Sequence, residues 1–74
     1  MKGTILVSEH KEVVSMNALK TALHNVTVTQ AKRKASSMQE NNDSVMVLRT
    51  LQDEVIASKS GGKWKDTSLA NLLN

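Results

Sequence analysis

Residues 27–36 have the sequence TVTQAKRKAS, and this stretch decides the fold. Its first four residues have the form of a capping box, in which the Thr27 hydroxyl accepts a hydrogen bond from the Gln30 backbone N–H and the Gln30 amide reaches back to Thr27. Beyond the box, apolar side chains recur at spacings of three and four residues, so they lie on one face of a helix. We therefore predict a helix over 28–40 that ends at the short polar side chains of residues 41–43.

Two strands are expected before this helix. The β-branched run at 4–8 predicts the first of them. The charged residues 9–12 have the character of a turn, and the apolar residues that follow fit a helix about as well as a strand. Because a second strand would pair with the first, we expect one within 18–26.

Three strands are expected after the helix, at 44–50, 54–59 and 63–65. Gly61 and Gly62 predict a hairpin turn before the last of them, because glycine adopts positive φ without steric cost. The tail has leucines at i, i+3 and i+4, so it either forms one amphipathic turn or stays frayed. The sum is an α+β fold of β(β)αβββ order, with a small antiparallel sheet of four to five strands and one helix packed across one face.

The 74 residues make one small domain. Its parts are an N-terminal strand region, the helix, the C-terminal strands and a tail, at 1–26, 27–41, 44–66 and 67–74. Within 45–48, odd and even positions are both apolar, so both faces of that strand need cover. One helix covers only one face. The leucine tail, a second copy of the chain or another protein is therefore expected on the other face.

Composition excludes several classes of protein. An apolar fraction of 39% and a charged fraction of 23% favour a soluble globular domain over a disordered chain. The absence of cysteine excludes disulfides and thiolate metal sites, and a single aromatic residue, Trp64, excludes a sheet that stacks RNA bases on several rings. The first apolar run is far shorter than a signal peptide or a membrane span. We therefore expect a cytoplasmic protein with no membrane partner.

The sequence contains no recognisable catalytic or metal-binding motif. His10 and His24 are the only histidines, and no carboxylate stands near either at the spacing of a ligand set. A nucleophile elbow, a His-Glu-x-x-His helix and a glycine-rich phosphate loop are all absent from the sequence. We expect no metal, no cofactor and no enzymatic activity.

Positive side chains fall in two clusters of a chain whose net charge is +3. In the helix, the consecutive basic residues 32–34 fan around the exposed side, with Arg33 opposite the apolar stripe. Lys59, Lys63 and Lys65 cluster around the last hairpin, where Lys63 and Lys65 share one face of their strand and Trp64 points to the other. If the two clusters lie side by side, they form a basic strip that contacts phosphates without regard to sequence and with strong salt dependence.

Both clusters also have a simpler interpretation. Lysine and arginine solvate surface helices and protect edge hairpins from aggregation. Trp64 is either a residue that packs on the helix or an anchor for a partner. The candidate binding residues are Gln30, Lys32, Arg33, Lys34, Lys59, Lys63, Trp64 and Lys65.

Two motifs carry a resemblance to a known family. The capped helix start at 27–36 resembles the pattern (S/T)-L-x-x-A-K-R-x-A-S of small phage proteins, and residues 62–66 have the ending G-K-W-x-D. Between 21 and 66 the chain resembles the ninth type I-F anti-CRISPR family, which are small phage inhibitors of the host's CRISPR RNA-guided surveillance complex. The resemblance implies an antiparallel sheet crossed by one helix.

The resemblance also implies partners and contact residues. Members of this family bind the repeated backbone subunit of the surveillance complex, where target DNA would otherwise pair with the guide, and are associated with holding duplex DNA non-specifically. Lys32 and Arg33 fall on the basic pair of the helix motif, and Lys63 and Trp64 fall on the closing motif. Gln30 and Ser36 match in residue type.

Three functions are therefore open from the sequence. The first is a non-enzymatic inhibitor that blocks the surveillance complex by steric and electrostatic occlusion. The second is a small basic accessory protein that binds DNA without sequence specificity. The third is a phage protein of other function that oligomerises through its uncovered sheet face.

Overall fold

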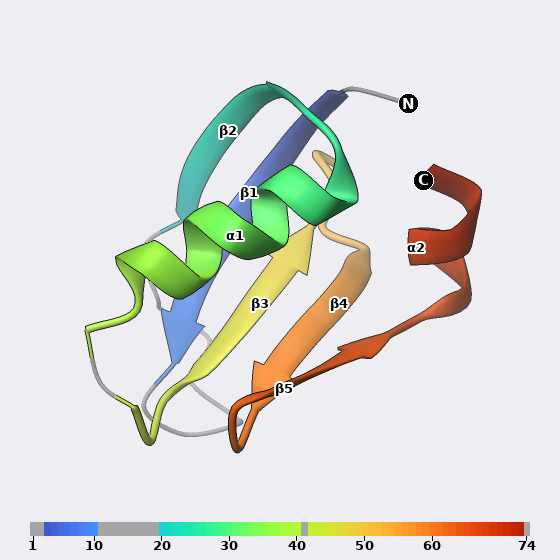
Figure 1. The fold of residues 1–74 in the computed structure, drawn as a ribbon. Coiled ribbons are helices and arrows are strands. Elements are labelled where there is room, and N and C mark those ends of the chain that lie inside the picture. Colours follow the sequence, from blue (N-terminus) through green and yellow to red (C-terminus); the bar gives the residue numbers. More distant parts are fainter. Residues whose placement is uncertain (1–2, 11–19, 41, 74) are drawn as a thin grey trace.

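The described part of the chain contains five strands in one antiparallel sheet, in the order β2-β1-β3-β4-β5, and two helices (Figure 1). The structure is a computed structural model that describes residues 3–10, 20–40 and 42–73. In chain order the elements are β1 (Gly3–His10), β2 (Lys20–Val26), α1 (Val28–Met38), β3 (Val45–Arg49), β4 (Val55–Ser60), β5 (Lys63–Asp66) and α2 (Ser68–Leu73). The predicted α+β fold is confirmed, and the tail forms the short helix α2.

The capping box predicted for the start of α1 is present. Thr27 Oγ1 accepts from the Gln30 N–H at 3.1 Å, and Gln30 Oε1 accepts from the Thr27 N–H at 2.9 Å. The end of the helix differs from the prediction, because α1 stops at Met38 rather than at residue 40. Gln39 adopts extended backbone with a ψ of 120°, and its side-chain amide donates to the Ser44 carbonyl oxygen at 3.1 Å. This contact turns the chain toward β3 earlier than the polar run alone predicts.

β1 is longer than the strand predicted at 4–8. Residues 9 and 10 pair with β3, so the turn predicted for 9–12 is wrong at its first two positions, and the other two lie outside the described residues. The strand expected within 18–26 is confirmed as β2, with residues 18 and 19 also outside the described residues. The three later strands are confirmed, and their observed bounds agree with the predicted ones to within one residue.

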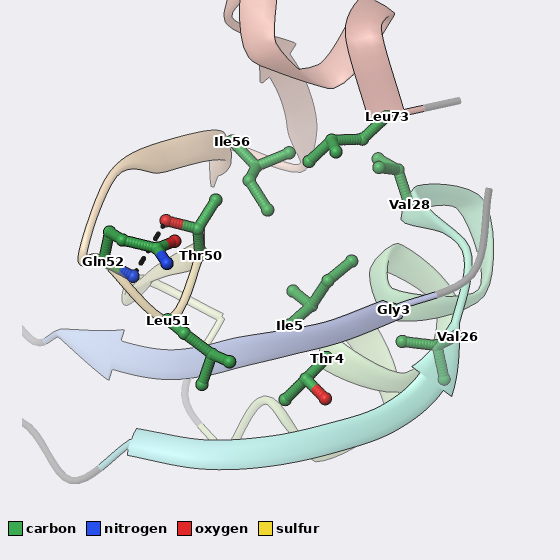
Figure 2. Close-up of a pocket in the computed structure, with 10 residues that line it drawn as sticks. All are labelled: Gly3, Thr4, Ile5, Val26, Val28, Thr50, Leu51, Gln52, Ile56 and Leu73. Atoms are coloured by element: carbon green, nitrogen blue, oxygen red, sulfur yellow. Dashed lines mark hydrogen bonds between the residues drawn. The ribbon is translucent and has the colours of Figure 1, made fainter.

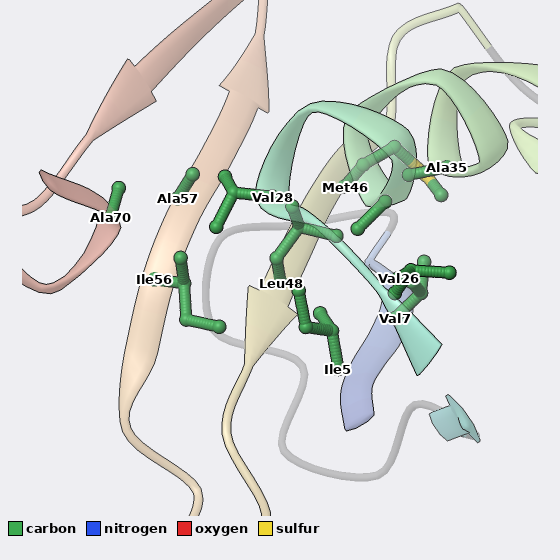
Figure 3. Packing of buried hydrophobic residues seen from close by; sticks show 11 residues of the cluster. Ile5, Val7, Val26, Val28, Ala35, Met46, Leu48, Ile56, Ala57 and Ala70 are labelled. Carbon is green, nitrogen blue, oxygen red and sulfur yellow. The ribbon is translucent and has the colours of Figure 1, made fainter. Parts of the chain in front are cut away.

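α1 joins β2 to β3, which lie on either side of β1, and it crosses one face of the sheet between them (Figure 1). Directly paired residues of an antiparallel sheet share a face, so Val7, Leu48 and Ala57 form one row beneath the helix. α1 faces this row with Ala31 and Ala35, both 0% exposed members of the core cluster, whose small side chains let the helix approach the sheet closely. Figure 3 shows Ala35 beside Met46 in this cluster. The core therefore lies between α1 and the middle of the sheet.

An irregularity in strand pairing widens this core. The register shifts between Leu48 and Arg49 of β3, opposite the start of β4. As a result Ile56 and Ala57 are both buried in the core, although adjacent residues of a regular strand point to opposite faces. Ala70 of α2 joins the same cluster, so the second helix extends the cover that α1 provides.

The predicted hairpin between β4 and β5 is confirmed. Ser60 pairs with Lys63, and the two residues between them are Gly61 and Gly62, with φ of +59° and +79°. Two consecutive residues with positive φ match the right-handed twist of the flanking strands, and glycine adopts them without strain. The turn therefore fixes the register of β5 against β4.

The face of the sheet turned away from α1 is also buried near its centre. Ser8 is 2% exposed, His10 is 5% exposed and Val47 is 8% exposed. Ser8 Oγ lies 2.9 Å from His10 Nε2 and accepts from Arg49 Nη1 at 3.2 Å. One of the three covers expected for this face was the leucine tail, and that prediction is wrong. α2 places Leu73 on the α1 side of the sheet, beside the start of α1 (Figure 2).

Candidate functional site

Side chains from α1, β4 and β5 meet on one surface, which we call the α1–β5 surface. It consists of Lys32, Ser36, Lys59, Trp64 and Asp66. Lys32 Nζ lies 2.6 Å from Asp66 Oδ1 and 6.0 Å from the centroid of the Trp64 ring. Lys59 Nζ donates to Ser36 Oγ at 3.2 Å. Two predicted basic residues from different elements therefore lie on the same surface as the tryptophan.

Regular geometry explains this convergence. Lys32 and Ser36 are four residues apart on α1, so they occupy the same flank of the helix. Lys59 pairs directly with Trp64 across β4 and β5, and Asp66 follows Trp64 by two residues and so shares its face. Trp64 is partly buried and packs against the core cluster, which places this face of the hairpin on the α1 side.

Asp66 changes the charge of the surface, although it is not among the candidate binding residues predicted from the sequence. Its carboxylate is close enough to the Lys32 ammonium to form an ion pair, with side chains 38% and 22% exposed. The Lys32 ammonium also lies at the outer limit of a cation–π contact with Trp64. The signal available in the sequence was the period of two on β5, which puts Asp66 on the face of Trp64.

The other helix residues lie around the rest of α1. Arg33 is exposed on the outer side of the helix, and Lys34 is exposed on the flank away from Lys32, since two residues span about 200°. Gln30 is exposed, and its side-chain oxygen accepts the Thr27 N–H of the capping box. Arg33 therefore borders the α1–β5 surface, whereas Lys34 lies on the opposite side of the helix.

Lys63 and Lys65 lie on the other face of the sheet. Lys65 pairs with Ser58, which in turn pairs with Val47, and this row lies on the side away from α1. The prediction that Lys63 and Lys65 share a face opposite Trp64 is confirmed by this register. The single strip expected from the sequence is divided, because the alternation of β5 directs these two lysines away from Lys32.

A second charged cluster occupies the face away from α1. Lys20 Nζ lies 2.6 Å from Asp53 Oδ1, and Arg49 Nε lies 3.6 Å from the same oxygen. The hydrogen bond from Lys20 is the main cause that lowers the pKa of the Asp53 carboxyl below its usual value. Sequence reasoning missed this cluster, because Lys20 and Asp53 are 33 residues apart and only the folded sheet brings them together.

The described residues offer neither a cluster of metal ligands nor a helix that could span a membrane. Within the described ranges, no group of three or more His, Cys, Asp or Glu side chains is placed to hold a metal ion. His24 Nδ1 lies 3.2 Å from Thr4 Oγ1 on an exposed part of the surface, whereas His10 is buried beside Ser8. Among the same residues, neither helix has the length and apolar character that crossing a bilayer requires.

An apolar pocket of about 200 Å³ opens near the start of α1 (Figure 2). Its lining comes from the start of β1, the end of β2, the turn between β3 and β4, and α2. Leu51 at its wall is 66% exposed. None of the α1–β5 surface residues lines this pocket, so the two features are separate.

Comparison with known proteins gives an informative structural similarity. The chain matches no protein-family model and no curated protein sequence. The solved structure of AcrIF9 is similar to it, with a TM-score of 0.79 and 31% sequence identity over 90% of this chain and 88% of that chain. The likeness therefore extends over nearly the whole of both chains and includes the sequence as well as the fold.

Proposed function

Because the chain belongs to the AcrIF9 family of anti-CRISPR proteins, we propose that it inhibits a type I CRISPR RNA-guided surveillance complex by binding to it. The inhibitor works without catalysis and acts in the cytoplasm of the bacterial host, where that complex operates. Family membership supports anti-CRISPR inhibition, and the geometry of the α1–β5 surface suggests how the inhibition is achieved.

Occlusion is the proposed mechanism. The observation that carries it is the placement of Lys32, Lys59 and Trp64 on one surface, bordered by Arg33. Ammonium and guanidinium groups contact the phosphates of a nucleic acid that lies in its channel, and an indole ring offers a stacking surface, so the bound protein occupies space that target DNA needs. We assign the backbone subunit of a type I-F complex as the partner, at the place where target DNA pairs with the guide.

The size of the protein suits this role. A standard interface takes about 800 Å² from each partner, which is roughly a sixth of the 5067 Å² of accessible surface here. One face of the molecule is therefore enough for specific binding. The remaining faces stay available, and non-specific contact with duplex DNA through exposed lysine and arginine side chains is the second part of the proposal.

The experiment that tests this proposal uses a purified type I-F surveillance complex. The complex is immobilised and the protein is added, and the amount of protein retained by the complex is measured. Labelled target duplex is then added, and the amount of duplex bound by the complex is measured. A photocrosslinking amino acid at position 33 then identifies the subunit. We expect the protein to be retained, the preference of the complex for target over arbitrary duplex to be lost, and the crosslink to form with the backbone subunit. Absence of retention contradicts inhibition by binding, and a crosslink only to other subunits contradicts the assigned partner.

Duplex DNA of arbitrary sequence provides a separate arm of the same experiment. If the protein shifts this duplex without the surveillance complex and never binds the complex, an accessory DNA-binding role replaces the inhibitor. If it binds the complex, retention of the same duplex by the loaded complex supports the second part of the proposal. The salt dependence of that retention reports how many phosphate contacts are made.

A further inference from the structure

The two lysines of the α1–β5 surface differ in how strongly their charges are compensated. Lys59 donates to a neutral hydroxyl, that of Ser36, and has no carboxylate partner among the described residues. Lys32 is held by the Asp66 carboxylate at 2.6 Å. A phosphate therefore meets the full charge of Lys59, but it must compete with Asp66 for Lys32.

We infer that Asp66 is a specificity-determining residue that weakens the binding of bare nucleic acid to the α1–β5 surface. Its carboxylate is 38% exposed, so it lies where an approaching phosphate is repelled. If a phosphate takes Lys32, Asp66 is left without its cation. Bare DNA has no cationic side chain to replace Lys32, whereas a protein that carries nucleic acid presents lysine and arginine beside its phosphates.

This inference rests on the proposed function, and it assigns the surface a preference within that function. The preferred partner is a nucleic-acid-bound protein surface, which supplies both an anion for Lys32 and a cation for Asp66. Bare duplex supplies only the anion. Asp66 thus favours the ribonucleoprotein over the large excess of free DNA in the cell.

Asp66→Asn tests the inference, because asparagine keeps the size of the side chain and removes its charge. Fluorescence anisotropy is measured with a labelled duplex of arbitrary sequence across a salt series, and in parallel with the purified surveillance complex. We expect the affinity for duplex to rise about two- to five-fold at low salt. The log–log salt dependence should steepen by up to about 0.9, since Lys32 then contacts phosphate without competition. The affinity for the complex should not rise.

Two further variants make the result specific. Glu54→Gln removes the same charge from an exposed side chain that has no cationic partner among the described residues. Its effect on duplex affinity should be smaller than that of Asp66→Asn. The gain from Asp66→Asn should disappear in the double variant Lys32→Gln/Asp66→Asn, because Lys32 is the group that the carboxylate restrains.

The outcomes separate the two proposals. If Asp66→Asn binds duplex no better than the parent, including the case in which neither binds, or gains equally for duplex and complex, the inference is wrong. An equal gain for Glu54→Gln also overturns it, because net charge alone would then explain the effect. If the parent protein fails to bind the complex, the proposed function fails, while the duplex measurements still show whether Asp66 competes for Lys32.

Discussion

The Lys32 ammonium lies between a carboxylate at 2.6 Å and an indole ring at 6.0 Å, and solvent reaches the pair. Exposed side-chain fractions of 22% for Lys32 and 38% for Asp66 mean that water and salt screen the attraction. The ion pair therefore orients Lys32 over Trp64 more than it stabilises the fold.

A double-mutant cycle with Lys32→Gln and Asp66→Asn measures this pair. We expect a coupling of about 0.2–1 kcal/mol in the free energy of unfolding by urea, because exposed ion pairs contribute little. The coupling should shrink as sodium chloride is raised. A coupling that is independent of salt would show that the pair is not the screened contact that the structure describes.

Asp53 gives a pH-dependent prediction on the opposite face. Lys20 donates to its carboxylate and lowers the pKa of Asp53 in the folded protein. The ionised Asp53 carboxylate therefore stabilises the folded protein at a pH above the ordinary carboxyl pKa. This stabilisation is lost as the pH falls through the lowered pKa that Asp53 has in the folded protein. We expect unfolding free energy to fall less steeply with acidification in Asp53→Asn than in the parent. Equal slopes would mean that Asp53 has the same pKa in both states.

At the scale of elements, the start of α1 depends on one side chain. The Thr27 hydroxyl accepts the Gln30 N–H at 3.1 Å, and that donor has no other partner in the helix. We expect Thr27→Ala to lower the free energy of unfolding by about 1 kcal/mol. Thr29→Ala is the matched control, because Thr29 is exposed within the same turn, and alanine there should be neutral or stabilising. Equal losses would show that the cap is not the cause.

The hairpin before β5 supplies a second test of local structure. Nothing lies within 4 Å of a Cβ added at Gly62, whose φ is +79°, so the cost of a side chain there comes from the backbone alone. We expect Gly62→Ala to cost about 1–2 kcal/mol of unfolding free energy. Gly3→Ala is the control, since the space around Gly3 is equally open and its φ is not positive. If both variants have the same stability, the turn does not require glycine.

Features of the helices and strands that depend on residues close together in the sequence could be predicted, whereas those that depend on distant residues could not. The capping box and the paired glycines act within four residues, and both were predicted from the sequence. The extension of β1 to His10 arises from pairing with β3, some 35 residues later, and no local signal carries it. The end of α1 likewise has a long-range contact, because the Glu40 N–H donates to Glu9 Oε2 of β1 at 3.0 Å, 31 residues away in the chain.

At the scale of the whole molecule, the residue types of the candidate site could be predicted but their grouping could not. Lys32, Lys59 and Trp64 were singled out from charge and composition, and the fold places them on one surface. The alternation of β5 also predicted that Lys63 points away from Trp64. Only the position of α1 shows that Lys63 and Lys65 are separated from Lys32, because α1 covers the face to which Trp64 points. Asp66 enters the sequence analysis only as part of the closing motif, and its pairing with Lys32 likewise depends on α1 covering the face that Asp66 shares with Trp64.

The central claim is that the α1–β5 surface blocks target DNA. The most direct measurement is the preference of a purified type I-F surveillance complex for labelled target duplex over an arbitrary duplex of equal length, after preincubation with each of two variants. Lys32→Glu/Lys59→Glu reverses charge on this surface, and Lys63→Glu/Lys65→Glu makes the same change in net charge on the opposite face. Circular dichroism first verifies that both variants fold.

We predict that the first variant loses inhibition by at least about ten-fold, as expected when buried or bordering interface charges are reversed, and that the second still inhibits. Full inhibition by the first variant, or equal loss by both, would contradict the claim.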